Sequence, residues 1–271
     1  MENLFAYSFM VRALAGAGLV GLTAPVLGLF LVLRRFSLIA DTLSHVALMG
    51  VAIGVVTGIQ PTLATFAAVT AGAVVIEMLR ARGRLPGDVV LAVVLYSTLA
   101  VAVTVISTAR GFSVDLLAFL FGNVLSITAA EVAWLGVLAA LVLLAVGAFF
   151  TELAQSAFDE DLARASGVRV GLVNLGLAVL TGAAITLSVR VVGVLLVGAL
   201  MVVPVLAGGL LARSLRGALA TGMGLGVAAA GAGITLAFYA DLPAGAAIVL
   251  CAVALLLIAA LVAGARRTRR A

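Results

Sequence analysis

Long apolar runs separated by short polar segments make up most of this sequence. Each run holds about 20 residues, enough for an α-helix rising 1.5 Å per residue to cross the roughly 30 Å hydrocarbon core of a bilayer. Runs of this length are typical of membrane helices and not of barrel strands. The pattern predicts about nine spans, with eight or ten as alternatives, at residues 12–33, 38–58, 62–80, 88–108, 131–150, 170–189, 192–212, 217–238 and 244–264.

Two connecting segments are longer than a turn. Residues 115–125, on the outer side, are apolar but too short to span, which predicts a short re-entrant or interfacial helix. Residues 155–167, on the inner side, form an amphipathic segment that begins at the capping-type residue Ser156 and ends at Gly167. No clean internal repeat or low-complexity linker divides the chain. We therefore expect one all-α transmembrane domain over residues 1–271.

Composition agrees with a polytopic membrane protein. Hydrophobic residues make up 65% of the chain and charged residues 10%, whereas soluble domains are roughly 45 to 50% apolar. The net charge of +5 could suggest nucleic acid, but all 16 basic residues are arginines and most lie between apolar runs. With Arg34 and Arg35 in the cytoplasm, only three arginines fall outside: Arg12, Arg110 and Arg190. This asymmetry predicts an outer N-terminus, an inner C-terminus and no nucleic-acid partner.

The absence of lysine excludes one class of activity. A Walker A loop needs the lysine of G-x-x-x-x-G-K-[ST] to reach nucleotide phosphates, and this chain has no lysine. It cannot be a P-loop ATPase. Its single cysteine, Cys251, also excludes an intramolecular disulfide.

Asp41 and His45, the only histidine, form the most informative polar pair in the apolar runs. Residues four apart lie about 40° apart on one helical face. If Arg35 marks the inner interface, Asp41 lies about 9 Å and His45 about 15 Å deep, near the midplane. Ionisable groups at such depth usually handle an ion or substrate. The pair therefore predicts a site that handles an ion or substrate, and one cation could in principle contact both side chains. The alternative is an Asp and His that bond each other and a neighbouring helix and only lock the packing.

A stripe of small residues follows on the same helix. Gly50, Gly54 and Gly58 recur every four residues on the face opposite His45. Small residues let membrane helices approach closely. We expect this stripe to pack against a neighbouring helix while Asp41 and His45 face a pathway.

The order of motifs resembles the permeases of the zinc, manganese and iron family of bacterial ABC importers, the zinc type most closely. The resemblance covers nearly the whole chain and rests on five segments: 35–52, which contains Asp41-x-x-Ser44-His45, 115–124, 156–168, 192–204 and 241–250. Two positions depart from the family pattern. Met49 replaces a proline found in many relatives, and Val205 begins a stretch that replaces a run of alanines. As a soft thioether, Met49 is expected to pack first and to bind metal only as a distant second.

The resemblance implies a homodimeric, non-enzymatic permease in the bacterial inner membrane. Its partners would be the lipid bilayer, a cytoplasmic ABC ATPase subunit that hydrolyses ATP, and an extracytoplasmic metal-binding protein. Asp41 and His45 would handle Zn²⁺, Mn²⁺ or Fe²⁺ as cargo, with no permanently bound cofactor. The inner segment would be the coupling helix that docks into the ATPase, through Ser156, Phe158, Asp159, Glu160, Asp161, Leu162, Arg164 and Gly167.

The sequence therefore predicts an importer permease for a divalent transition metal, with zinc favoured over manganese and iron, that works by alternating access. A second hypothesis is a stand-alone secondary transporter or channel, in which Asp41 and His45 relay protons. An intramembrane metalloenzyme is the weakest hypothesis, because one histidine cannot form an HExxH motif.

Overall fold

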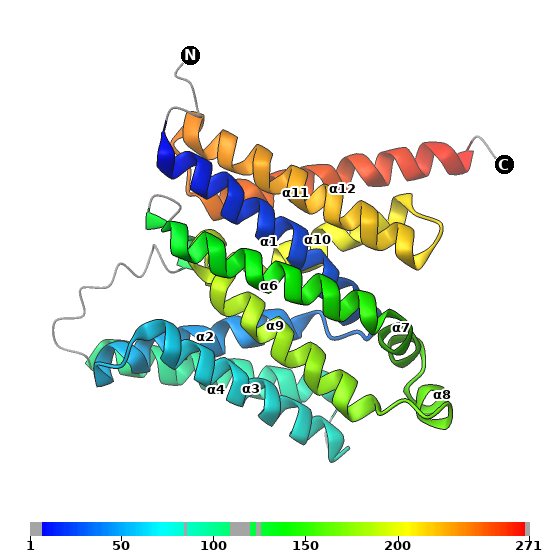
Figure 1. Cartoon of the computed structure of the whole chain (residues 1–271), viewed down its shortest axis with the longest axis horizontal. Helices are drawn as coiled ribbons and strands as arrows, with labels where there is room; N and C mark the ends of the chain where they lie inside the picture. Colours follow the sequence, from blue (N-terminus) through cyan, green and yellow to red (C-terminus); the bar gives the residue numbers. More distant parts are fainter. Residues whose placement is uncertain (1–6, 84–85, 109–119, 123–125, 269–271) are drawn as a thin grey trace.

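The computed structural model describes residues 7–83, 86–108, 120–122 and 126–268, and every regular element among them is a helix (Figure 1). The helices are α1 (Ser8–Leu33), α2 (Leu38–Thr57), α3 (Pro61–Ala81), α4 (Gly87–Thr108), α6 (Ala129–Ala148), α7 (Phe150–Phe158), α8 (Glu160–Ala165), α9 (Val170–Val192), α10 (Val194–Leu211), α11 (Leu215–Ala240) and α12 (Ala244–Thr268). Among the described residues, eight helices are long and apolar enough to cross a membrane, and α10 is a shorter apolar helix. The all-α class and the prediction of about nine spans are confirmed.

The break between α9 and α10 depends on Gly193. Its backbone angles, φ 92° and ψ 156°, lie in a region that side-chain-bearing residues rarely adopt. The short segment at residues 120–122 lies against this break, since a Cβ on Gly193 would meet backbone atoms of Leu120 and Phe121. A Cβ on Gly245, near the start of α12, would likewise meet the backbone of Phe121 and Val192. The rest of the predicted outer helix at 115–125 lies outside the described residues.

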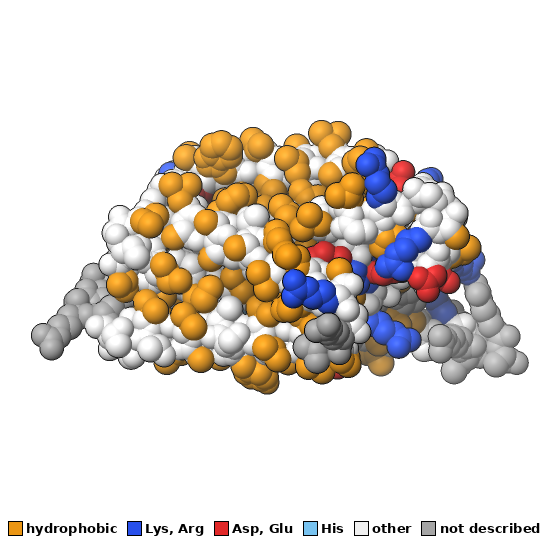
Figure 2. Space-filling model, turned by 90° about the horizontal axis from the view of Figure 1, so that it is seen from below, with side chains coloured by type: hydrophobic (Ala, Val, Ile, Leu, Met, Phe, Trp, Pro, Cys, Tyr) orange, Lys and Arg blue, Asp and Glu red, His pale blue; other side chains and the backbone are white. Residues whose placement is uncertain are grey.

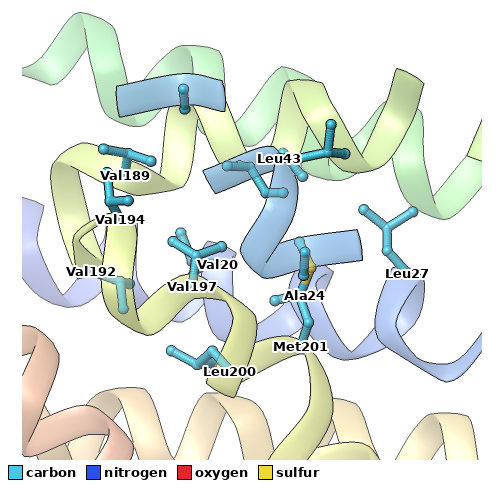
Figure 3. Packing of buried hydrophobic residues seen from close by; sticks show 14 of the residues in the cluster. Val20, Ala24, Leu27, Leu43, Val189, Val192, Val194, Val197, Leu200 and Met201 are labelled. Atoms are coloured by element: carbon cyan, nitrogen blue, oxygen red, sulfur yellow. The ribbon is translucent and has the colours of Figure 1, made fainter. Parts of the chain in front are cut away.

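The core of the bundle lies between α1, α2, α9 and α10. Most of α1 and α2 is buried, whereas most residues of α3, α4, α6 and α12 are only partly buried or exposed. Figure 3 shows part of the apolar cluster: Val20, Ala24 and Leu27 of α1, Leu43 of α2, Val189 and Val192 of α9, and Val194, Val197, Leu200 and Met201 of α10. Glycine allows the closest approach here, because a Cβ on Gly28 would overlap the carbonyl of Met201. The same cluster packs α2 against α10, and Asp41 and His45 lie on α2.

Charged and apolar surfaces are segregated along the bundle. Figure 2 shows hydrophobic side chains over the middle of the molecule and most visible charged side chains towards one end, where α7 and α8 lie in Figure 1. Large exposed apolar side chains occur on several outer helices, among them Tyr96, Trp134, Leu144 and Leu261. This distribution suits a multi-pass protein whose middle is surrounded by lipid and whose charged end lies outside the hydrocarbon core.

Candidate metal site and cytoplasmic segment

The α1–α2 turn sets the position of the candidate metal-binding helix. The N–H of Arg35 donates to the carbonyl of Val32 at 3.0 Å, and that of Phe36 donates to Leu31 at 2.9 Å, which closes the end of α1. Arg35 has a φ of 60°, an uncommon conformation for a residue other than glycine. The chain reverses within these residues and enters α2 with Asp41 in its first turn.

Asp41 and His45 lie on one partly exposed stripe of α2, between residues that are fully buried. The hydroxyls beside them are satisfied within the bundle: Thr42 donates to the carbonyl of Leu38 at 2.9 Å, and Ser44 donates to that of Ala40 at 2.8 Å. Nδ1 of His45 is buried and has no hydrogen-bond partner in the described part of the chain. Among the described residues, no hydrogen bond joins Asp41 to His45. The pair therefore keeps oxygen and nitrogen atoms that could bind a ligand.

The carboxylate of Asp41 lies against α10. A Cβ placed on Gly198 would overlap the Oδ1 atom of Asp41, so only glycine leaves room for this carboxylate as it stands. Sequence reasoning did not single out Gly198. Its signal is a Gly-Ala pair within the otherwise bulky apolar run from Val194 to Pro204, but that signal does not say which residue Gly198 faces.

Few other side chains near the pair could bind a metal ion. Met49 lies one turn beyond His45 on the same stripe, partly buried and packed against the apolar core. Across residues 7–83, 86–108, 120–122 and 126–268, no group of three or more His, Cys, Asp or Glu side chains is placed to hold a metal ion. Among these residues, the candidate site therefore has two such side chains, Asp41 and His45, both on α2.

The three glycines of the stripe on α2 have two different structural roles. A Cβ on Gly50 would meet Thr65 and Ala68, and one on Gly54 would meet Pro61 and Ala64, so both glycines lie in close contact with α3. Gly58 has no atom within 4 Å of such a Cβ, and the prediction that it packs is wrong. Its φ of 73° explains the difference, because it follows the last residue of α2 and ends that helix in a left-handed conformation.

The inner segment consists of two short helices, α7 and α8, and not of one. The chain turns at Phe149 and begins α7 at once, so Ser156 lies in the last turn of α7 and is buried. It does not start a helix, and that prediction is wrong. Asp159 takes the capping role, since its side chain accepts from the N–H groups of Asp161 and Leu162, both at 3.0 Å.

The outward face of this segment combines apolar and acidic groups. Phe158 is 71% exposed and Leu162 is 66% exposed, so the segment presents two large apolar side chains on its surface. Asp161 is also exposed and accepts from Arg164 at 2.8 Å. Gly167 closes α8, with its N–H bonded to the carbonyl of Arg164 at 3.0 Å.

The inward face of the segment is held by Glu160. Its carboxylate pairs with Arg80 of α3 at 3.0 Å and accepts from the amide of Asn174 of α9 at 3.2 Å. Partial burial raises the pKa of Glu160, but Arg80, Asn174 and Arg34 outweigh it, so the pKa is lower than usual. Glu160 is therefore ionised at neutral pH. Of the residues predicted for the segment, Ser156 and Glu160 face the bundle and Phe158, Asp161 and Leu162 face away.

A bundle of long apolar helices, with an Asp and His pair on a mostly buried helix and an exposed amphipathic segment at one end, is the architecture of a polytopic membrane protein. The chain belongs to the ABC 3 transport family, whose family model matches residues 6–263. It is 31% identical over 264 residues to the manganese transport system membrane protein MntC of Listeria monocytogenes, covering 97% of this chain and 94% of that protein.

Two further comparisons bear on this assignment. The chain is 31% identical over 157 residues to the high-affinity zinc uptake system membrane protein ZnuB of Haemophilus influenzae, covering 58% of this chain and 60% of that protein. Among solved structures, PsaBC from Streptococcus pneumoniae in complex with Fab matches with a TM-score of 0.84 at 29% identity, covering 94% of this chain and 92% of that chain.

Proposed function

We propose that this chain is the permease subunit of an ABC importer that moves a divalent transition metal into the cytoplasm. The observation that carries the proposal is the Asp41 and His45 pair, partly buried on α2, with Nδ1 of His45 unpartnered among the described residues. Relatives named for manganese and for zinc both support a metal cargo. One carboxylate and one imidazole suit either ion, so the proposal names the class of divalent metal, with Zn²⁺, Mn²⁺ and Fe²⁺ as its members.

The proposed mechanism is alternating access in the bacterial inner membrane. An extracytoplasmic binding protein delivers the ion, and Asp41 and neutral His45 bind it briefly as oxygen and nitrogen ligands. Water or other oxygens complete the coordination. Because the Asp41, His45 and Met49 stripe is partly exposed on a single chain, a second copy against α2 would enclose the pathway. This supports a homodimeric permease.

ATP hydrolysis is assigned to a separate cytoplasmic subunit, because the chain has no lysine for a Walker A loop. We propose that this subunit docks on α7 and α8. A hollow of about 450 Å³ lies along them, and its lining includes Phe150, Phe158 and Leu162 together with Arg216 of α11. The exposed side chains of Phe158 and Leu162, with Asp161 beside them, suit a partner groove that offers apolar contacts and a basic rim.

Metal uptake by proteoliposomes tests this function. The chain is reconstituted with its ATPase and its binding protein, and uptake of radiolabelled zinc and manganese is followed. We expect uptake that requires both ATP and the ATPase subunit, with no metal transport by the permease alone. Uptake that proceeds without the ATPase and follows a proton gradient would instead support the stand-alone secondary transporter.

The docking surface makes its own prediction. Leu162→Ala should weaken binding of the ATPase subunit by about 10-fold or more, as expected when an apolar anchor is truncated at an interface centre. Affinity is measured between the solubilised permease and the isolated ATPase. Leu172→Ala serves as the matched control, because Leu172 is 58% exposed near the inner end of α9 but lies outside α7 and α8. Equal affinities for the two variants would place the docking surface elsewhere.

A further inference from the structure

Two partly buried arginines, Arg34 and Arg80, lie behind α7 and α8, the docking segment of the proposed ATPase partner. The sequence marked Arg34 only as a residue of the inner side. Arg34 follows the last residue of α1, and Arg80 lies in the last turn of α3. The guanidinium of Arg34 donates to the side-chain oxygen of Asn174 on α9 and to the hydroxyl of Ser156 on α7. The end of α1 is thereby bonded directly to the first helix of the docking segment.

Arg80 makes the corresponding contacts for the second helix. Its side chain is 16% exposed and pairs with Glu160 of α8 at 3.0 Å and with Glu77 of α3 at 3.1 Å. The same guanidinium lies 5.0 Å from the ring centroid of Phe36, within the range of a cation–π contact. Phe36 belongs to the α1–α2 turn, so Arg80 contacts both α8 and the approach to α2.

Asn174 joins the two arginines into one network. Its side-chain oxygen accepts from Arg34, while its amide nitrogen donates to Glu160 at 3.2 Å. The docking segment is thus bonded through Ser156 and Glu160 to α1, α3 and α9. Charge-assisted bonds of this kind are stronger and more directional than neutral ones.

The charges of the network balance only when α8 is in place. Burial, followed by the nearby charge of Arg80, lowers the pKa of Arg34 to about 10, so both arginines remain charged at neutral pH. On the bundle side, these two cations have Glu77 as their close carboxylate, and α8 supplies Glu160 as the second. Moving α8 away would leave an excess positive charge in a partly buried place, which is costly.

The network also lies next to the helix that carries the candidate metal site. Arg34 directly precedes Arg35, the residue with a φ of 60° in the α1–α2 turn, and Phe36 of the same turn lies under Arg80. Asp41 follows in the first turn of α2. A displacement of α7 and α8 must therefore either carry this turn with it or break the bonds to both arginines.

We propose that Arg34 and Arg80 are positioning residues that connect the ATPase-docking segment to the α1–α2 turn, so that movement of α7 and α8 reaches the helix that bears Asp41 and His45. The inference rests on the proposed function, since it concerns how that importer is driven. Hydrogen-bonded ionic networks between rigid helices are a physical route for such coupling. Arg34 and Arg80 touch no cargo in this scheme.

The test compares transport with ATP hydrolysis in the complete reconstituted complex. Arg34→Ala and Arg80→Ala should still assemble with the ATPase and hydrolyse ATP, but the metal moved per ATP should fall by about 10-fold, within the usual range of coupling between sites. Arg34→Lys should restore part of the ratio, because an ammonium can reach one of the two partners but lacks the fork of a guanidinium. Arg82→Ala is the control, as Arg82 is exposed and has no ion pair within the described ranges.

The outcomes separate the inference from the proposed function. The inference is overturned if both alanine variants move as much metal per ATP as the parent in a complex whose uptake depends on ATP. The proposed importer function would not be affected by that result. A second outcome also overturns the inference: the variants bind the ATPase poorly, but the complex that does form moves the parental amount of metal per ATP. The arginines would then only support the fold of the segment. If either variant fails to fold, Glu160→Gln tests the same bond to Arg80 from the other side, and a parental ratio there counts against the inference. Uptake by the parent without any ATPase overturns both proposals.

Discussion

Replacing His45 by alanine should lower metal uptake by about 100-fold or more while leaving the complex assembled. Even residues that only support a metal ligand commonly cost 10- to 100-fold when they are changed, and a direct ligand should cost at least as much. The imidazole makes no hydrogen bond within the described chain, so its removal breaks no internal bond. Asp41→Asn should act in the same direction, because the amide keeps the shape of the side chain and removes its charge.

Uptake of zinc and manganese by the reconstituted complex measures this effect, at equal amounts of permease and alongside ATP hydrolysis. Met49→Leu is the matched control, because Met49 lies on the same stripe of α2 and leucine has nearly the same volume as methionine. We expect it to transport at close to the parental rate. Parental uptake by both the His45 and the Asp41 variants would show that the pair locks helix packing and does not bind cargo.

Gly198→Ala should reduce uptake by about 10-fold or more, through Asp41 and not through loss of the fold. The new methyl group would overlap the Oδ1 atom of Asp41, which can move aside because it is the end of a side chain. The helix would persist, but the carboxylate would leave its position beside α10. A displacement of about 1 Å at a reacting or binding group can cost as much as 100-fold in rate.

Gly209→Ala on the same helix provides the comparison, because a Cβ there meets no atom within 4 Å. The melting temperatures of the two variants in detergent should be close to each other, while the dependence of uptake on metal concentration should change only for Gly198→Ala. Identical uptake curves for the two variants would mean that α10 does not set the position of Asp41.

Glycine spacing shows how far local patterns reach. Gly50, Gly54 and Gly58 have the same spacing in the sequence, yet the first two contact α3 and the third ends α2. The capping residue of the inner segment shows the same limit: Ser156 and Asp159 are both good capping residues, and the start of α7 at Phe150 decides between them. Boundaries of this kind depend on where the neighbouring helices end.

By itself, the sequence determined the helical class, the approximate number of spans and the shared face of Asp41 and His45, and it predicted that the arginine-rich end faces inward. These features are local, because apolar length, charge between runs and a four-residue spacing need no knowledge of distant residues. Only the tertiary structure brought Gly198 against Asp41 and placed Arg34 and Arg80 behind α7 and α8. These partners lie far apart along the chain, and they meet because close packing of α1, α2, α3, α9 and α10 selects which residues face each other.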